Sequence, residues 1–241
     1  MNATIASLTA SVVLGKRRAL FLFILPGLLI AMAVGIRVAA GADSSIAATV
    51  LQTFAVGTVV PLLGLIAGTG VIGSEIDDGS IVYVLAKPIP RPMIVLTKLL
   101  VAVGTLVVFA AVPVLIAGVV LAGLTDGIAV AFTVGALLAS IAYAALFLLL
   151  AVLTRHAVVV GLLYALIWES LVGSFVPGAR TLSIQQWAMS LTDRLVSGDA
   201  GATIEATVQP LVAAILLLVV TVGATWFAGQ RLRSLTLTDA E

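Results

Sequence analysis

Six long apolar stretches constrain this chain more than any other feature of its sequence. They lie near residues 19–36, 50–73, 94–121, 128–153, 157–176 and 208–228. A helix needs about 20 apolar residues to cross the roughly 30 Å hydrocarbon core of a bilayer, because every backbone N–H and C=O must be satisfied within the segment. Hydrophobic residues make up 62% of the 241 and charged residues only 10%, against roughly 45 to 50% and 25% in soluble domains. The sequence therefore predicts an all-α, polytopic membrane protein with six transmembrane helices.

The distribution of lysine and arginine predicts how these helices are oriented. With a cytoplasmic N-terminus, nine of the twelve basic residues fall on the cytoplasmic side, and only Arg37, Arg180 and Arg194 fall outside. This excess follows the positive-inside rule, and an even number of spans then places both termini in the cytoplasm. We expect a multi-pass protein of the cell (plasma) membrane. The basic residues are scattered rather than gathered into a stripe, which argues against a nucleic-acid partner.

The N-terminal residues 1–18 carry the basic trio Lys16, Arg17 and Arg18 ahead of the first apolar stretch. Their position predicts a short interfacial helix on the inner leaflet, with its charges at the headgroups. A cleaved signal peptide is the alternative, because residues 40–42 loosely fit a small-x-small cleavage pattern. About 15 residues precede the first lysine, and cleavage would leave five spans, so we favour the interfacial helix.

The external side is predicted to carry one short helix and one carboxylate of interest. Within the loop at 177–207, Ser183 and Gln186 form a capping box, and apolar residues follow at helical spacing. We expect an amphipathic helix whose Trp187 lies at the level of the lipid headgroups. This helix is either a structural lid or a gate at the exit of a transport path. Glu169, toward the outer end of the fifth stretch, either reaches the outer interface or contacts a substrate or a dimer partner.

The sequence lacks the residues that membrane enzymes and ion-coupled transporters require. It has no phosphate-binding G-x-x-x-x-G-K-[ST] loop, no H-E-x-x-H motif, no cysteine and a single histidine. Only Glu169 lies well inside an apolar stretch, so charged residues for ion coupling are scarce. We therefore predict no catalytic residue, no metal site and no cofactor in this chain. If the chain transports a molecule, the energy comes from elsewhere.

Small residues and prolines within the spans predict how the helices pack. Small side chains recur four positions apart in spans one and two, at Gly27, Ala31, Gly35, Gly64 and Gly68. Such faces allow close approach of helices, within one chain or between two. Pro61 and Pro113 are expected to kink spans two and three, because each removes one backbone hydrogen bond.

The segment between the second and third stretches gathers charges and prolines in an otherwise apolar chain. Residues 73–92 read GSEIDDGSIVYVLAKPIPRP. Gly79 permits the backbone to turn after the second span, and Ser80 can cap a new short helix that must end before Pro88. A helix that presents residues 81–85 to water makes physical sense only if the membrane surface or a partner protein covers it.

This segment resembles the coupling region of the membrane subunit of ABC-2 type ATP-binding cassette exporters. In that family an acidic residue closes the second span, Gly-Ser or Gly-Thr opens a short apolar coupling helix, and a Pro-Ile/Val-x-Arg turn precedes a lysine about seven positions on. The matching residues stand here in the same order, at Glu75, Gly79, Ser80, Pro88, Ile89, Arg91 and Lys98. Pro90 and Pro92 depart from the pattern, which more often has Ser or another non-proline residue there. The six spans, the cytoplasmic termini and the external loop before the last span also match the family.

The resemblance implies one transmembrane domain over residues 1–241, with an N-terminal segment at 1–18, a cytoplasmic coupling loop at 74–93 and an external loop at 177–207. It implies a dimer of permease chains, most simply a homodimer, that forms an export path. Each copy would bind a separately encoded ABC ATPase subunit, which holds the ATP and magnesium. The residues implied in ATPase coupling are Glu75, Asp77, Asp78, Gly79, Ser80, Ile81, Val82, Tyr83, Val84, Leu85, Pro88 and Arg91. Glu169 and Trp187 are the candidates for an external gate or a dimer contact.

Two other classes of function remain open. An ion-coupled or passive transporter would need polar residues buried at mid-membrane, for which the spans offer mainly Thr58, Thr69, Thr105 and Ser140. A non-transport membrane scaffold or an immunity-type protein would be favoured if the loop bound no ATPase.

Overall fold

The structure, a computed structural model, describes residues 15–73, 75, 90–124, 127–172, 180–196 and 208–234. Within these residues the chain is helical and contains no β-strand. The elements in chain order are α2 (Lys16–Ala40), α3 (Ser44–Val50), η1 (Leu51–Val59), α4 (Val60–Gly70), α7 (Arg91–Leu106), η2 (Val107–Ala111), α8 (Val112–Ala122), α9 (Ile128–Leu153), α10 (Ala157–Leu163), η3 (Tyr164–Val172), η4 (Arg180–Leu182), α12 (Ile184–Asp193) and α13 (Pro210–Ser234). Residues 1–14 of the predicted N-terminal interfacial helix and the predicted coupling helix after Ser80 lie outside the described residues. The basic trio at 16–18 forms the first turn of α2 and is continuous with the first span.

Five helices of the described chain are long and apolar enough to cross a membrane. They are Leu20–Ala40, Ser44–Gly70, Arg91–Ala122, Ile128–Leu153 and Pro210–Leu232. The fifth predicted span, at 157–176, is represented by a shorter apolar helix, Ala157–Glu169. Even extended through η3, its described part reaches only about 24 Å at 1.5 Å per residue, which is less than a bilayer core. The break between spans four and five is confirmed, because α9 ends at Leu153 and α10 begins at Ala157.

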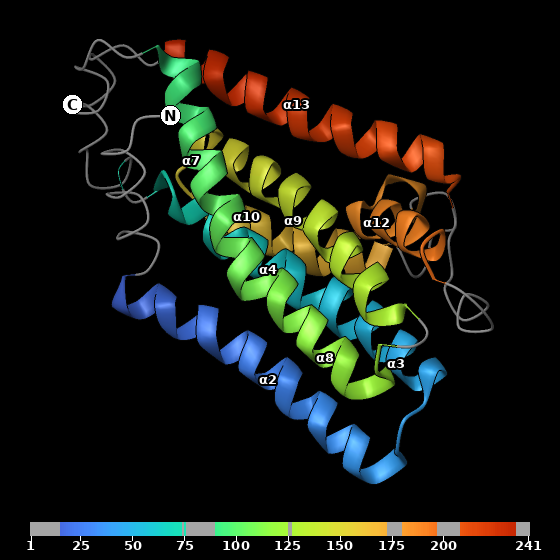
Figure 1. Cartoon of the computed structure of the whole chain (residues 1–241). Coiled ribbons are helices and arrows are strands. Elements are labelled where there is room, and N and C mark those ends of the chain that lie inside the picture. Colours follow the sequence, from blue (N-terminus) through green and yellow to red (C-terminus); the bar gives the residue numbers. More distant parts are fainter. Residues whose placement is uncertain are drawn as a thin grey trace.

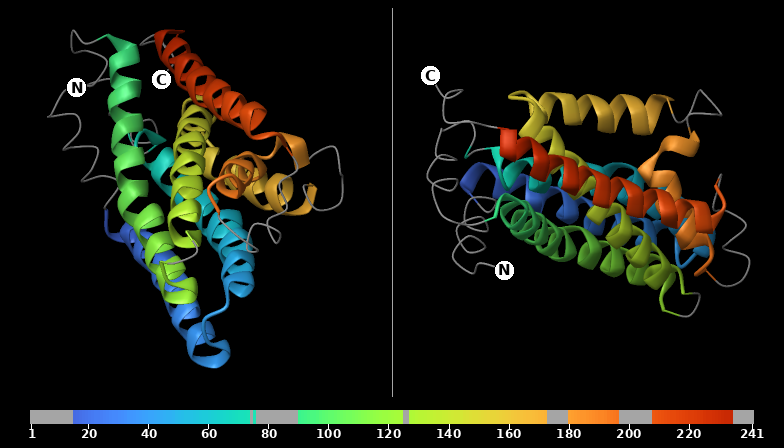
Figure 2. Two further views of the ribbon diagram at one scale, coloured as in Figure 1. Left: turned by 45° about the vertical axis from the view of Figure 1, so that its right-hand side comes forward. Right: turned by 90° about the horizontal axis from the view of Figure 1, so that it is seen from above.

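Helix α9 forms the centre of the bundle and contacts α4, α8, α12 and α13. Along their most apolar windows, α9 and the second span are each 61% buried, whereas α2 and α13 are each only 22% buried. Figures 1 and 2 show α2 and α13 on opposite sides of the bundle with α9 between them. The outer helices therefore leave broad apolar faces for lipid or for other chains, as expected of a membrane protein.

The small residues of span two pack inside the chain. A Cβ atom at Gly64 would lie 2.8 Å from Cβ of Tyr143, and one at Gly68 would lie 2.8 Å from Cβ of Phe147. These glycines therefore let α4 approach α9 more closely than any larger residue would. By contrast, nothing lies within 4 Å of the corresponding positions at Gly27 and Gly35 in α2.

Spans two and three each contain a π-helical segment directly before a proline. η1 ends at Val59, two residues before Pro61, and η2 ends at Ala111, two residues before Pro113. A proline lacks the N–H that would close an α-helical turn, and a local π-helical adjustment lets neighbouring N–H groups satisfy the freed carbonyls. The expected irregularity at both prolines thus takes the form of widened turns on their N-terminal side.

The starts of α2 and α7 and the end of α13 lie on the same side of the bundle, at the left in Figure 1. We call this side the Arg91 end. The opposite side, the Asp43 end, holds the connection between α2 and α3. There Asp43 caps α3, because its Oδ1 accepts hydrogen bonds from the backbone N–H groups of Ser45 and Ile46.

Candidate functional site

Lys98 is a completely buried lysine near the Arg91 end. Its Nζ lies 2.7 Å from Oε1 of Glu75 and donates a hydrogen bond of 2.6 Å to the carbonyl oxygen of Val71. A charged ammonium in an apolar interior is costly unless it is paired and hydrogen-bonded, and both conditions are met here. Because Val71 and Glu75 follow α4 and Lys98 lies on α7, this contact joins the end of span two to span three.

Arg91 makes a second polar connection at the same end. Its Nη1 donates a 2.6 Å hydrogen bond to the carbonyl oxygen of Leu232, close to the end of α13. The last carbonyls of a helix have no partner within the helix and carry the negative end of its dipole, so a guanidinium group is well placed there. Arg91 therefore joins the start of span three to the end of span six.

These two connections flank the segment in which the sequence predicts the coupling site. Glu75 precedes residues 76–89 and Arg91 follows them, so both chain ends of that segment are fixed to the bundle. The remaining predicted coupling residues lie outside the described part of the chain, and their role stays a prediction: Asp77, Asp78, Gly79, Ser80, Ile81, Val82, Tyr83, Val84, Leu85 and Pro88. A contact of Glu75 with an ATPase also stays a prediction, but the structure adds an internal partner for this carboxylate.

Glu169 is buried, with only 5% of its surface exposed. Its Oε1 accepts hydrogen bonds from the hydroxyl of Tyr164 at 3.0 Å and from the backbone N–H of Ile184 at 3.1 Å. Its Oε2 accepts a hydrogen bond from the hydroxyl of Ser183. Ile184 is the first residue of α12, whose free N–H groups favour a negative charge. The carboxylate of Glu169 therefore attaches span five to the start of α12.

The predicted external helix exists, but its surroundings differ from the expectation. Ser183 caps α12 by accepting a hydrogen bond of 3.3 Å from the N–H of Gln186, as the capping box predicts. The expected position of Trp187 at the lipid headgroups is wrong. Its side chain is 4% exposed, and its indole N–H donates a 2.8 Å hydrogen bond to the carbonyl of Thr181.

The polar side of α12 is also turned into the bundle. Ser190 and Thr192 are buried and bond to carbonyls of their own helix, and Nε2 of Gln185 reaches the carbonyl of Gln52 in η1 at 3.3 Å. Helix α12 packs against α9 and α13 as well as η1. Amphipathic spacing is compatible both with a membrane surface and with a position between other helices. In the structure α12 packs between helices. A gate or dimer role of Glu169 and Trp187 stays a prediction.

Sequence reasoning missed the partners that give these residues their positions. The motif from Glu75 to Lys98 gives the order of these residues but not the contact between them, and Lys98 lies about two turns inside α7. Tyr164 was not singled out, although it lies five positions before Glu169. No group of three or more His, Cys, Asp or Glu residues that could hold a metal ion occurs within the described residues.

The comparisons with known proteins assign the family. The model of the ABC-2 family transporter protein matches residues 38–228, which run from the end of the first span into the last span described above. No curated protein matches the chain. The match covers most of the sequence and agrees with the motif that runs from Glu75 to Lys98. The chain therefore belongs to the ABC-2 family of transporter proteins.

Proposed function

We propose that this protein is the permease subunit of an ATP-driven ABC exporter. Two copies would form the translocation path, and residues 75–92 of each would couple to a separately encoded ATPase that binds ATP and magnesium. Membership of the ABC-2 family supports a permease in general terms, since members of the family generally lack an ATPase site of their own. In this arrangement both termini and the Arg91 end face the cytoplasm of the cell.

The observation that carries the proposal is the polar connection on each side of residues 76–89. The pair of Lys98 and Glu75 fixes the segment to spans two and three. The hydrogen bond from Arg91 to Leu232 fixes it to spans three and six. A displacement of the segment would therefore be transmitted directly to three spans.

The physical mechanism is rigid-body movement. Packed helices do not deform continuously, so a small displacement at one end is transmitted as a shift of whole helices. ATP-driven closure of two ATPase subunits would push residues 80–86 of each permease, and spans two and three would carry that movement toward the Asp43 end. The short distances at Lys98 make this junction stiff, because the two charges of a buried ion pair attract each other strongly and separating them costs energy.

The first test is co-purification in mild detergent with the ATPase encoded beside the permease. Wild type should retain the ATPase, and the variant Tyr83→Asp plus Leu85→Asp should lose it while remaining folded and monodisperse. Retention of the ATPase by this variant would place the coupling site elsewhere. If wild type itself bound no ATPase, the scaffold or immunity-type function would be favoured.

A second test separates ATPase binding from force transmission. Lys98→Met combined with Glu75→Gln removes both charges of the buried pair, so no unpaired charge remains in the bundle. In the fraction of this variant that co-purifies with the ATPase, we expect the difference in protease accessibility at the Asp43 end between the ATP-bound and nucleotide-free complexes to be lost. The exposed Arg155→Gln is the control and should keep that difference. An unchanged ATP response in the double variant would contradict transmission through this junction.

A further inference from the structure

Tyr143 on α9 carries a hydroxyl group that is buried in the bundle without a hydrogen bond. The residue is 0% exposed, and its hydroxyl has no hydrogen-bond partner among the residues that the structure describes. A buried hydroxyl without a partner lowers stability, and a phenylalanine would fill the same space without that loss. The hydroxyl therefore needs an explanation beyond packing.

The surroundings of Tyr143 connect it to the junction between Glu169 and α12. The ring of Tyr143 stacks on Phe147 with centroids 5.8 Å apart. Phe147 meets the ring of Tyr164 edge to face, and the hydroxyl of Tyr164 donates to Glu169. The carboxylate of Glu169 and the backbone of Gln185, the second residue of α12, also act electrostatically on the Tyr143 hydroxyl. Tyr143 therefore lies beside this junction, on the side of α9.

The three donors to the carboxylate of Glu169 come from two parts of the chain. Tyr164 belongs to η3, as Glu169 itself does, whereas Ser183 and Ile184 are at the start of α12. If α12 moved away from α9, Glu169 would lose two donors, and a buried carboxylate without donors is costly. Tyr143 would stay in place, because it belongs to α9 and packs against α4.

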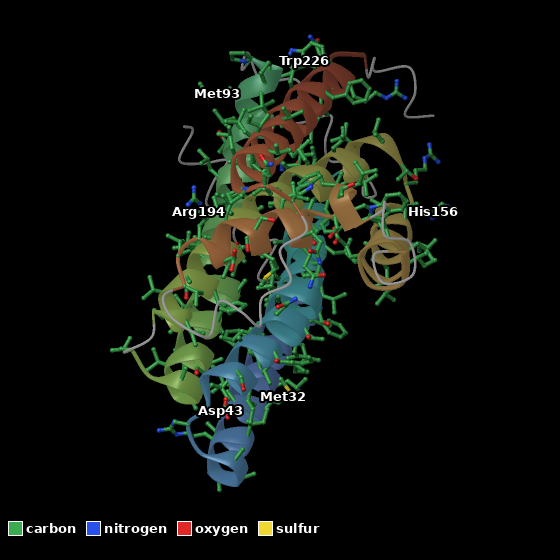
Figure 3. The ribbon with its side chains drawn as sticks, turned by 90° about the vertical axis from the view of Figure 1, so that its right-hand side faces the viewer. Met32, Asp43, Met93, His156, Arg194 and Trp226 are labelled. Atoms are coloured by element: carbon green, nitrogen blue, oxygen red, sulfur yellow. The ribbon has the colours of Figure 1, made fainter. Side chains whose placement is uncertain are left out.

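Helix α12 is built so that it can move as a unit. It has ten residues, and Figure 3 shows it crossing in front of the long spans, with Arg194 after its last residue. The hydroxyls of Ser190 and Thr192 bond to carbonyls of α12 itself, so these bonds would be kept. The hydrogen bond from Gln185 to the carbonyl of Gln52 is 3.3 Å long and would be broken. Rigid-body movement of such a helix leaves the spans intact.

We propose that α12 is a lid with two positions, and that Tyr143 is the positioning residue for the second position. In the position described here, Ser183 and Ile184 donate to Glu169. When α12 moves away from α9, the hydroxyl of Tyr143 replaces them as a donor to the carboxylate. The inference goes beyond the proposed exporter function and does not rest on it, because the movement belongs to this chain alone.

The movement is measured by cysteine labelling, because the chain has no cysteine of its own. Met189→Cys places a thiol at a completely buried position of α12, where N-ethylmaleimide reacts only after a local opening. The full-length protein is labelled in mild detergent without an ATPase. Leu195→Cys, at a half-exposed position, should react at the same rate in every background. Ala102→Cys, buried in α7, should react only if the whole protein unfolds. If Met189→Cys does not fold, the buried Ala188→Cys replaces it.

Three substitutions around Glu169 have different expected effects on the labelling of Met189→Cys. Tyr143→Phe should slow it about tenfold, because it removes a hydrogen bond to a charged group from the second position only. Ser183→Ala should accelerate it about tenfold, because it removes a donor and a helix cap from the first position only. Tyr164→Phe should change the rate by less than about twofold, because Tyr164 donates to Glu169 in both positions.

The comparison of the two tyrosines decides the proposal. An unchanged or faster rate in Tyr143→Phe would overturn it, because the hydroxyl would then have no part in the movement or would hold α12 in the first position. Equal slowing by Tyr143→Phe and Tyr164→Phe would also overturn it, since the effect would then come from ring packing and not from the choice of donor. No ATPase is present, so these outcomes do not bear on the exporter proposal.

Discussion

Tyr164 and Glu169 are brought together by a π-helical turn. The hydroxyl of Tyr164 lies 3.0 Å from Oε1 of Glu169, although the two residues are five positions apart. In an α-helix of 3.6 residues per turn, side chains five positions apart point about 140° away from each other. Both residues belong to η3, whose hydrogen bonds follow the i to i+5 pattern. The wider turn therefore aligns the phenol with the carboxylate and aims both at the start of α12.

Replacing Glu169 should destabilise the protein strongly. Glu169→Ala leaves the hydroxyl of Ser183 and the N–H of Ile184 without their acceptor in a buried site, and we expect a loss of about 3 kcal/mol in the free energy of unfolding. Glu169→Gln keeps one acceptor oxygen and should cost about half as much. Unfolding by SDS in mixed micelles measures both values. A loss of stability below that of an exposed control such as Leu218→Ala would mean that the cluster does not hold α12.

Removing only the hydroxyl of Tyr164 tests one hydrogen bond of that cluster. Tyr164→Phe keeps the ring, which meets Phe147 edge to face with centroids 6.1 Å apart, and deletes only the hydroxyl. We expect a loss of about 1 kcal/mol. In the Glu169→Gln background the same substitution should cost less, because a neutral acceptor makes a weaker hydrogen bond. Equal losses in both backgrounds, measured by the same SDS unfolding, would show that the two side chains do not interact.

The ion pair between Lys98 and Glu75 predicts a strongly non-additive pair of substitutions. Lys98→Met leaves the carboxylate beside a buried apolar side chain and should cost about 3 kcal/mol. When Glu75→Gln is added, no charge remains unpaired, and much of that loss should be recovered. We expect a coupling energy of roughly 2 kcal/mol from the double-mutant cycle. Additive effects in SDS unfolding would mean that the pair does not form in the folded protein.

At the Asp43 end of the bundle, the carboxylate of Asp43 should make the stability of the protein depend on pH. The hydroxyl of Ser45 and the N–H groups of Ile46 and Ser45 hydrogen-bond its carboxylate and hold the pKa of Asp43 below 3.8. A carboxyl whose pKa is lowered on folding contributes stability that is present above the unfolded pKa and disappears as the pH falls through the folded pKa.

We therefore expect the melting temperature of wild type to exceed that of Asp43→Asn at pH 7, and the difference to shrink as the pH falls below 3.8 toward the lowered pKa of the folded carboxyl. Asn can still cap the helix but does not titrate, so it is the matched reference. Differential scanning fluorimetry across this range gives the comparison. A difference that stays constant with pH would contradict the role of the carboxylate charge.

The parts of the fold that the sequence predicted are those that a single span determines by itself. The limits of α9, Ile128–Leu153, follow from apolar length and from the polar break at Thr154. The cap at Ser183 follows from local hydrogen-bonding chemistry. Both features depend on residues that are close in the sequence, so no knowledge of the tertiary structure was needed.

The parts that could not be predicted depend on which helices meet. Nothing in the sequence near Trp187 distinguishes a membrane surface from the crevice that α12 occupies. The pairing of Lys98 with Glu75 joins residues 23 positions apart and needs the relative rotation of two spans. No proline follows η3 directly, so the sequence does not predict its π-helical hydrogen bonding. The contact between Tyr164 and Glu169 in the structure shows which side chains this wider turn brings together.

The close packing of α12 on α9 gives the most specific prediction. A Cβ atom at Gly135 would occupy the place of the Thr192 hydroxyl and would lie 3.5 Å from the carbonyl oxygen of Ala188. Gly135→Ala should therefore push α12 away from α9 and cost about 2 kcal/mol, as overpacking does. Adding Thr192→Ala removes the obstructing oxygen, leaves the Cβ of residue 192 at an ordinary 3.4 Å, and should restore most of the stability. Gly104→Ala is the control, because nothing lies within 4 Å of its Cβ position, and it should be neutral or slightly stabilising. SDS unfolding of the four proteins decides the matter: if the double variant were no more stable than Gly135→Ala, the contact with Thr192 would not set the distance between these helices.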